Sequence, residues 1–524
     1  MLNKSIGKQD KIVFTTLEGL MPKEHFLRDL DKYVDFSFIY GKVEHLYSHT
    51  GRRSIDPVVL VKMLLLGFLY GIDSERKIEQ EAVVNIAFRW FLGIDLDETV
   101  PDHSTISQTR RRKWSGTTIF EDIFTEIVQK CIDCGLVDGS QILTDSTHIK
   151  ASASNDKCET VTVNVEPRAY IQKLNKLCDE EDLRLRADAI SKGKKKRGQK
   201  LSNTPKTKEI AKSTTDPDCG MLNRPGKPSG FHYLNHQSVD GKSGIITDVY
   251  VTPANTNDFE PYADRIKYQI RKYGFAIKEV GIDSGYDFEE VHKEMYDLGI
   301  KTFTPLRDTE KATSDKVYPP SAFEYDSDND IYICPNGCRL KYSSVHKKSR
   351  RKVYRASQKD CKKCPKRNKC IGGITMQHRM LAISFFKEIV DKQRENYGTS
   401  RYYEIQRKRR VYCEGNFALQ KDNHNLRRTR KRGNERVTEH CLCSALALNL
   451  KRLVKYLKIK DYPTRVHDGI AIFLQRLFRQ LKRGFGKNPF PLFSCFVNTP
   501  VWEFFFCIKN PLLLWRIPQR FWGL

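Results

Sequence analysis

The sequence predicts a mixed α/β protein with a helical N-terminal domain and a cysteine-rich insertion. Apolar residues recur at helical spacing between about residues 50 and 135. After this region the pattern changes to short apolar runs, a hairpin and a helix in alternation, which is typical of a mixed α/β core. Five cysteines then gather between Cys334 and Cys370.

Two apolar stripes predict the N-terminal helices, one through Val61, Leu64, Leu65 and Phe68 and one through Ile78, Ala82 and Ile86. Pro101-Asp102-His103-Ser104 is typical of a helix start, and we prefer this interpretation to a catalytic triad because neighbours in sequence rarely point at one another. The basic run Arg110–Lys113 suits a helical DNA-binding module. A helical bundle without a special function has the same pattern, so both interpretations remain open.

The mixed core begins with the apolar run 142–145, which ends in an acid. Charged residues dominate 155–217, which predicts an inserted helical or flexible segment. Asp240-Gly241 between two apolar runs predicts a hairpin turn. Asn257-Asp258 is expected to cap the next helix, and the run 280–283 predicts a second strand that ends in an acid.

The charge balance predicts a polyanionic partner. Ninety-one Lys and Arg stand against 64 Asp and Glu, a net charge of +27 over 524 residues, while 39% hydrophobic residues exclude wholesale disorder. Nucleic acid and an anionic membrane surface would both attract such a chain. The first residues lack the apolar stretch of a signal peptide, and no run of apolar residues is long enough to span a bilayer. We therefore expect a soluble cytoplasmic protein with reduced thiols.

Three acids are the candidate catalytic residues. We expect Asp145 and Asp283 each to close a short apolar strand and Glu414 to lie on a helix. Carboxylates that converge from separate elements are what two-metal phosphoryl transfer needs, since Mg²⁺ and Mn²⁺ prefer oxygen ligands. Arg410 and Lys421 lie four residues before and seven after Glu414, so we expect all three side chains on one helical face. An isolated Arg–Glu pair at this spacing is an ordinary ion pair.

The motifs Leu143-Thr144-Asp145-Ser146-Thr147, Gly281-Ile282-Asp283-Ser284-Gly285-Tyr286 and Cys413-Glu414-Gly415 resemble the three acidic motifs of bacterial insertion-sequence DDE transposases. Arg410, Glu414 and Lys421 fit the spacing of the Y-(2)-R-(3)-E-(6)-K signature of that group, with Arg407 at the tyrosine position. Residues 54–113 resemble the helical N-terminal domain of InsH-type transposases. The resemblance covers roughly residues 10–460.

The resemblance implies an RNase H-like mixed-sheet core and a domain organisation. Residues 1–135 would form a helical N-terminal DNA-binding domain. Residues 136–460 would form the RNase H-like DDE catalytic domain, with insertions at about 155–217 and 325–375. Residues 461–524 would be a C-terminal tail of unknown role.

The resemblance also implies a function. A transposase of this group binds the terminal inverted repeats of its insertion sequence and catalyses metal-dependent DNA cleavage and strand transfer into target DNA. Asp145, Asp283 and Glu414 would hold Mg²⁺ or Mn²⁺, and the DNA contacts would come from Arg410, Lys421, Arg427 and Arg428. We expect a nucleoid-associated homo-oligomer, at least a dimer on two DNA ends. A catalytically inactive DNA-binding relic or repressor, and a nuclease that cuts without joining, are the alternatives.

The clustered cysteines form two pairs and a fifth residue: Cys334-x₃-Cys338, Cys361-x₂-Cys364 and Cys370. Paired thiols at this spacing resemble a zinc ribbon, in which four sulfurs hold a structural Zn²⁺. The first pair is spaced more loosely than usual, and five cysteines exceed the four places. Zinc and a small insertion packed with reduced thiols both remain open.

Overall fold

The computed structural model describes residues 14–484 apart from His49, 52–53, 166, 192, 194–205, 225, 227–228, 308–316 and 372–376. The chain divides into two compact units, residues 1–455 and 456–524. The last helix, α18 (Asn434–Gly484), starts in the first unit, and its side chains are described as far as Asp461. The expected tail therefore begins inside a helix, and its residues 485–524 lie outside the described part.

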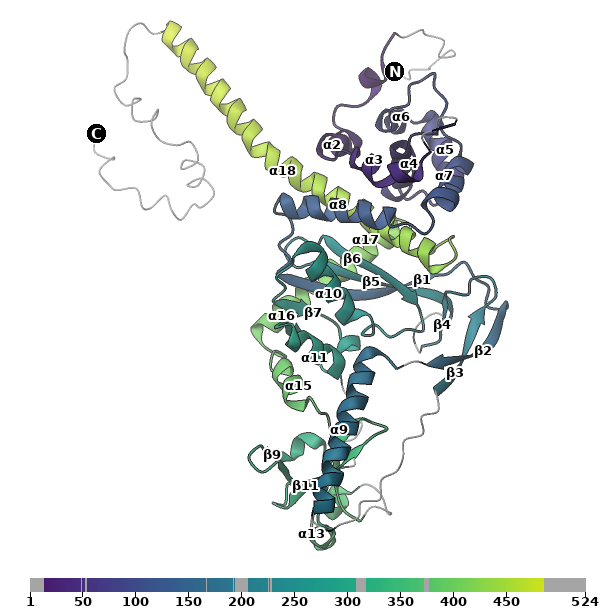
Figure 1. The fold of residues 1–524 in the computed structure, drawn as a ribbon. Coiled ribbons are helices and arrows are strands. Elements are labelled where there is room, and N and C mark those ends of the chain that lie inside the picture. Colours follow the sequence, from purple (N-terminus) through teal and green to yellow (C-terminus); the bar gives the residue numbers. More distant parts are fainter. Residues whose placement is uncertain are drawn as a thin grey trace, which may run out of the picture. The chain divides into compact units, whose positions relative to one another are not determined.

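The N-terminal part is helical, as predicted (Figure 1). Its helices are α1 (Leu17–Leu20), α2 (Phe26–Tyr33), α3 (Phe38–Val43), α4 (Pro57–Leu69), α5 (Glu75–Val84), α6 (Ile86–Leu92), α7 (His103–Thr109) and α8 (Ile119–Asp133). Helix α4 is apolar on nearly all sides because its neighbours cover it. Asp102 caps α7 by accepting the backbone N–H of Ser104 at 2.6 Å, which confirms the predicted helix start.

A mixed sheet forms the core. Its strands are β1 (Gln141–Lys150), β4 (Gly220–Leu222), β5 (Gly230–Asp240), β6 (Ile246–Pro253), β7 (Glu279–Gly281) and β8 (Lys301–Phe303). The order is β6-β5-β1-β7-β8, with β4 also paired to β5. Strands β6, β5 and β1 run antiparallel, whereas β1, β7 and β8 run parallel. This is the mixed α/β arrangement expected of an RNase H-like core, and it confirms the predicted fold class.

The hairpin of the core follows from its turn residues. Asp240 accepts the backbone N–H groups of Lys242 and Ser243, both at 3.0 Å, which closes the predicted Asp-Gly turn between β5 and β6. Every residue of β5 is buried, as befits a strand in the middle of a sheet. Helices α10 (Tyr262–Tyr273) and α11 (Glu289–Asp297) follow β6 and β7.

Helices α16 (Ser400–Arg409) and α17 (Gly415–Asn423) pack on the sheet, joined by the π-helical turn η5 (Arg410–Glu414). Gln406 of α16 donates to the backbone carbonyls of Ile282 at 2.9 Å and Phe303 at 2.7 Å. Its amide therefore links the helix to the ends of β7 and β8. Since Glu414 lies at the end of η5, this contact also fixes the helix that carries the third acid.

Two groups of elements lie outside the core sheet. The first comprises β2 (Cys158–Val165), α9 (Ala169–Ser191) and β3 (Lys206–Ser213). The second comprises a five-stranded antiparallel sheet, β9 (Glu324–Asp326), β10 (Ile331–Ile333), β11 (Arg339–His346), β12 (Arg351–Ala356) and β13 (Met380–Ile383), with helices α13 (Gln358–Lys362), α14 (Arg367–Cys370) and α15 (Lys387–Arg394). Lys347 pairs with Asp179 at 3.0 Å, and Arg350 donates to Asn175 at 2.7 Å, so α9 contacts the second sheet (Figure 1).

The core supplies hydrogen-bond donors to the end of helix α4. The last carbonyls of a helix have no partner within it. Here the carbonyl of Gly67 accepts from Asn425 at 3.1 Å, and that of Leu69 accepts from Lys451 at 2.9 Å. The ring nitrogen Nδ1 of His424 lies 2.7 Å from the carbonyl of Phe68. The N-terminal helices are thus joined by polar contacts to the segments that follow α16.

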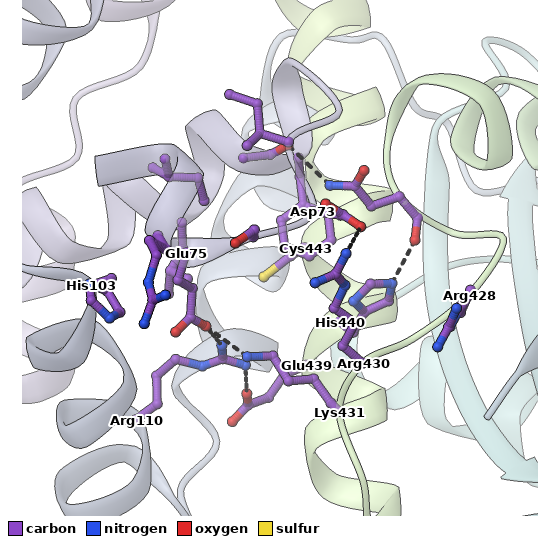
Figure 2. Close-up of a pocket in the computed structure, with 18 of the residues that line it drawn as sticks. Asp73, Glu75, His103, Arg110, Arg428, Arg430, Lys431, Glu439, His440 and Cys443 are labelled. Atoms are coloured by element: carbon purple, nitrogen blue, oxygen red, sulfur yellow. Dashed lines mark hydrogen bonds and ion pairs between the residues drawn. The ribbon is translucent and has the colours of Figure 1, made fainter. Parts of the chain in front are cut away.

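A buried ion-pair network strengthens this junction (Figure 2). Arg110 donates to Glu75 at 2.7 Å and to Glu439 of α18 at 2.5 Å, and its side chain is 12% exposed. Lys431 also pairs with Glu75, at 2.7 Å. The network lines a cavity of about 350 Å³ between α5, α7 and α18. Because paired charges already fill its walls, we interpret this cavity as part of the junction between the two regions.

None of the helices in the described part of the chain combines the length and the apolar character that crossing a bilayer requires.

The junction predicts a strong effect of Arg110→Met. The substitution leaves Glu439 buried without its cation and Glu75 with Lys431 alone, and removing one partner of a buried ion pair typically costs about 3–5 kcal/mol. Chemical denaturation of the full chain should show a loss of that order. Arg111→Met, at the exposed neighbouring position, is the control and should change stability by less than about 0.5 kcal/mol. Equal effects of the two substitutions would contradict the role of the network.

Candidate active site

Strand pairing brings the first two acids together. Leu143 of β1 lies opposite Gly281 of β7 in the parallel register, and each aspartate follows its partner residue by two positions. Asp145 of β1 and Asp283, which follows the end of β7, therefore lie at equivalent positions beyond this pairing. The prediction that Asp145 closes a strand is wrong, because β1 continues to Lys150 through its pairing with β5. Only the pairing with β7 stops before Asp145.

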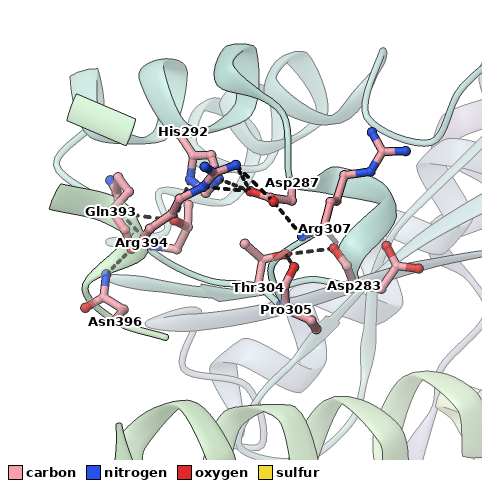
Figure 3. Close-up of polar contacts among 10 residues, drawn as sticks. Asp283, Asp287, His292, Thr304, Pro305, Arg307, Gln393, Arg394 and Asn396 are labelled. Carbon is pink, nitrogen blue, oxygen red and sulfur yellow. Dashed lines mark hydrogen bonds and ion pairs between the residues drawn. The ribbon is translucent and has the colours of Figure 1, made fainter. Parts of the chain in front are cut away.

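Hydrogen bonds hold the turn that carries Asp283 (Figure 3). Its carboxylate accepts the backbone N–H of Gly285 at 2.8 Å, and its backbone carbonyl accepts the hydroxyl of Thr304 at 2.8 Å. Asp287, four residues later, accepts from Arg394 and from the backbone N–H of Arg307. Hydrogen bonds to its side chain and to its backbone thus fix the position of Asp283.

Glu414 contacts Arg409, an arginine that the sequence spacing did not predict. Arg409 donates to Asp145 at 2.7 Å and contacts Glu414 at 3.4 Å, so its guanidinium bridges the first and third acids. Its Nε also donates to Gln406 at 3.1 Å. A π-helical turn has i→i+5 hydrogen bonds, which places residues five apart on one face. Arg409 rather than Arg410 therefore faces Glu414, and Arg410 is exposed.

Burial and mutual repulsion act on the acids. The pKa of Asp145 is raised to about 6, chiefly by burial; Arg409 opposes this shift, and the charges of Asp283 and Glu414 add to it. Burial also raises the pKa of Asp283, and the negative charge of Asp258 is the second-largest cause of this rise. Only the side chain of Glu414 is more than half exposed. The two strand acids are therefore held where ionisation is costly, which favours binding of a cation.

The residues present fit a divalent metal by their chemistry. Mg²⁺ and Mn²⁺ take carboxylate oxygens, and three carboxylates converge on this region from β1, β7 and η5. Within the described part of the chain, these three do not form a set whose oxygens all lie within 4.8 Å of one another. Arg409 stands between two of them. A bound cation would replace the bridging that the guanidinium provides here.

Two of the predicted DNA-contact residues share a basic cavity beside Asp145. Lys421 donates to the hydroxyl of Thr147, two residues after Asp145, at 2.5 Å. The cavity has a volume of about 360 Å³, and its walls include Thr147, His148, Lys150, His232, Lys421 and Arg427. Arg427 also pairs with Asp422. Arg428 is exposed, and it lines the junction cavity instead (Figure 2).

The five clustered cysteines line one small cavity, with Cys334 and Cys338 in the turn between β10 and β11. The sulfur of Cys334 accepts the backbone N–H groups of Asn336 at 3.4 Å and Cys338 at 3.3 Å, in a turn that Gly337 allows with φ of 77°. In the described chain, no three of the sulfurs all lie within 4.8 Å of one another.

Two family models match the chain. Residues 15–112 match a model described as a transposase domain (DUF772), and residues 333–454 match one described as a transposase DDE domain. The second match includes Glu414 and the cysteine cluster, whereas Asp145 and Asp283 lie before it. No curated protein matches the chain.

Solved structures show distant likenesses. The piggyBac transposase synaptic complex with hairpin DNA is 10% identical, with 90% of this chain and 84% of that chain covered and a TM-score of 0.27. The Mos1 mariner paired-end complex with Mn is 9% identical, with 55% and 70% covered and a TM-score of 0.15.

The match to the transposase DDE domain defines the class: the protein carries the domain of a DDE-type polynucleotidyl transferase. Together the two matches place a DUF772 transposase domain before a transposase DDE domain in this chain.

The raised pKa of Asp145 predicts a gain in stability for Asp145→Asn in EDTA. The folded state binds the Asp145 proton more tightly than the unfolded state, whose pKa is near 3.8. Ionised Asp145 thus destabilises the fold fully above about pH 6 and not below pH 3.8. We expect Asn to stabilise the chain by about 1–3 kcal/mol at pH 8, and by less as the pH falls towards 4.

Urea denaturation at pH 8 and pH 5 measures this gain. Asp97→Asn, at an exposed position of the N-terminal part, is the control and should show little change at either pH. An Asp145→Asn variant less stable than the wild type at pH 8 would show that the Arg409 ion pair outweighs the cost of burial.

Proposed function

We propose that the protein binds the terminal inverted repeats of an insertion sequence, cuts the DNA there and joins the 3′ ends to target DNA. The parallel register that sets Asp145 beside Asp283 is the observation that carries the proposal. Glu414 supplies the third carboxylate through its contact with Arg409. Divalent ions bound by these acids would activate the attacking oxygen and stabilise the leaving one.

The other residues of the site would bind and orient the DNA. Lys421 and Arg427 line the basic cavity next to β1, where they would hold the phosphate backbone. Arg410 and Arg428 are exposed cations that would extend this contact. Arg409 would release Asp145 and Glu414 when cations bind, and its guanidinium would then be available to a phosphate oxygen.

The proposal includes a division of labour along the chain. Residues 1–135 would bind DNA with the helical domain, and residues 136–460 would carry out the reaction, on a homo-oligomer that holds at least two DNA ends. An inactive relic or repressor would bind the same DNA without cutting it, and a nuclease would cut without joining. The assay below distinguishes these alternatives.

The catalytic assay compares Asp283→Asn and Glu414→Gln with the wild type. A labelled duplex carrying the ends of the encoding element, with Mg²⁺ or Mn²⁺, should be cut to leave a 3′-hydroxyl and then joined to a second duplex. Each substitution removes a carboxylate that would hold a cation, so cleavage should fall by at least about 100-fold. Binding of the duplex should persist.

Glu404→Gln is the matched control, because Glu404 lies on α16 and pairs with Arg401 and Lys408, outside the acidic site. It should cut normally. Full cleavage by the folded Glu414→Gln variant would refute the metal-carboxylate mechanism. Binding without cleavage by the wild type would support the inactive relic, and cleavage without joining would support the nuclease.

We also propose that the cysteine cluster binds a structural Zn²⁺. Its support is the donor set, five thiols around one small cavity, with the N–H groups of residues 336 and 338 directed at Cys334. A bound ion would draw the sulfurs closer than they lie here. Cys361 and Cys370 are mostly buried, so the ion would stabilise the core of the second sheet.

Zinc content measures this site. The purified full chain should carry about one Zn²⁺ per chain, and the double substitution Cys361→Ser with Cys364→Ser should lose it and lower the melting temperature. Cys158→Ser, at an exposed position on β2, should keep the ion. A wild-type chain that carries no zinc after growth with added Zn²⁺ would favour reduced thiols instead.

A further inference from the structure

Asp258 does not have the role that its local sequence predicts. It lies in the loop between β6 and α10, where Asn257-Asp258 was expected to cap the helix. That expectation is wrong, because α10 begins after Pro261 without a side-chain cap. Instead Asp258 accepts a hydrogen bond at 2.6 Å from the hydroxyl of Ser146, the residue after Asp145. A contact across 112 residues thus ties this carboxylate to the strand of the active site.

The second oxygen of Asp258 faces the region of Asp283. A methyl group added at Gly285 would lie 2.9 Å from Oδ1 of Asp283 and 3.3 Å from Oδ2 of Asp258. The two carboxylates therefore border the same small space above Gly285. In agreement, the charge of Asp258 is the largest charge contribution to the raised pKa of Asp283, after burial.

A buried hydroxyl provides an independent observation. Tyr286 is 1% exposed, and its hydroxyl has no hydrogen-bond partner among the described residues. Tyr286 and Asp258 line the same small cavity, together with Thr144 and His236. Burial raises the pKa of Tyr286 well above its usual value, and the charges of Asp258, Asp145 and Asp283 raise it further. A buried polar group without a partner indicates an ordered water or ion that the protein chain alone does not supply.

We propose that Asp258 is a fourth carboxylate of the metal site, whose Oδ2 binds the same cation as Asp283. Ser146 holds the other oxygen and so fixes the orientation of the side chain. This inference rests on the proposed function, because it assigns a further ligand to the cation of that site. A structural tie between the loop and β1 is the competing interpretation, and it predicts no effect on metal affinity.

The experiment measures Mn²⁺ binding to the full chain without DNA, by calorimetry and by the electron paramagnetic resonance signal of free Mn²⁺. Asp258→Asn should weaken binding by about 10- to 100-fold. Asp264→Asn, at an exposed position on α10, is the matched control and should bind as the wild type does. Ser146→Ala keeps every carboxylate but frees Asp258, and it should weaken binding by a smaller factor of about 3–10.

The outcomes separate the inference from the proposed function. Wild-type binding with unchanged affinity in Asp258→Asn overturns the inference and leaves the three-acid site intact. The proposed metal site itself is overturned if the wild type binds no Mn²⁺, or if Asp145→Asn binds Mn²⁺ with the affinity of the wild type. If Asp258→Asn does not fold, Ser146→Ala decides, and unchanged Mn²⁺ affinity in that variant overturns the inference.

Discussion

The parallel pairing of β1 with β7 holds two like-charged carboxylates side by side, and the arrangement of the candidate site depends on this pairing. The pairing of Leu143 with Gly281 sets Asp145 and Asp283 at the same level, and backbone hydrogen bonds keep them there. Burial makes their ionisation costly, as the raised pKa values of both show. Arg409 offsets part of this cost through its ion pairs with Asp145 and Glu414. A site strained in this way binds cations more readily than one whose acids are fully paired.

The strand of Asp145 also connects the reaction site to the N-terminal helices. Beyond Asp145, β1 runs to Lys150. The backbone N–H of Lys150 donates to the carbonyl of Arg427 at 3.3 Å, and its carbonyl accepts the N–H of Thr429 at 3.1 Å. The same segment includes His424 and Asn425, which contact the end of α4. The basic segment predicted to touch DNA thus lies between the acidic site and the helical domain. A DNA duplex bound along this segment would contact elements of both regions.

Local patterns predicted most of the fold because local physics determines those parts. The helical stripes, the Asp102 cap and the Asp-Gly turn each depend on neighbours within a few residues. The acids Asp145 and Asp283 were likewise found from short apolar runs. The length of β1 past Asp145 was not, because its pairing partner β5 lies about 90 residues away in sequence. The form of the two insertions also depends on contacts with each other that no local pattern contains.

Arg409 and Asp258 show why the site was predicted only in part. The spacing rule assumes a regular α-helix, in which residues four apart share a face. Because Glu414 ends a π-helical turn, the residue that faces it is Arg409, five positions before it, and not Arg410. Asp258 occupies a position typical of a helix cap, but its oxygen bonds to Ser146 instead. In both cases a tertiary contact outweighs the local preference. Such departures gather at functional sites, since residues there are arranged for ligands as well as for stability.

The exposure of the acids indicates which part of the site moves when a cation binds. Side chains of Asp145 and Glu414 are 15% and 55% exposed, and the strands that carry the aspartates are fixed by the sheet. Glu414 instead projects from a π-helical turn, and its contact with Arg409 is long, at 3.4 Å. Moving Glu414 breaks one weak ion pair, whereas moving Asp145 would break strand hydrogen bonds. A cation bound at these acids would therefore displace Glu414 on the helix side, whereas the sheet would keep Asp145 in place.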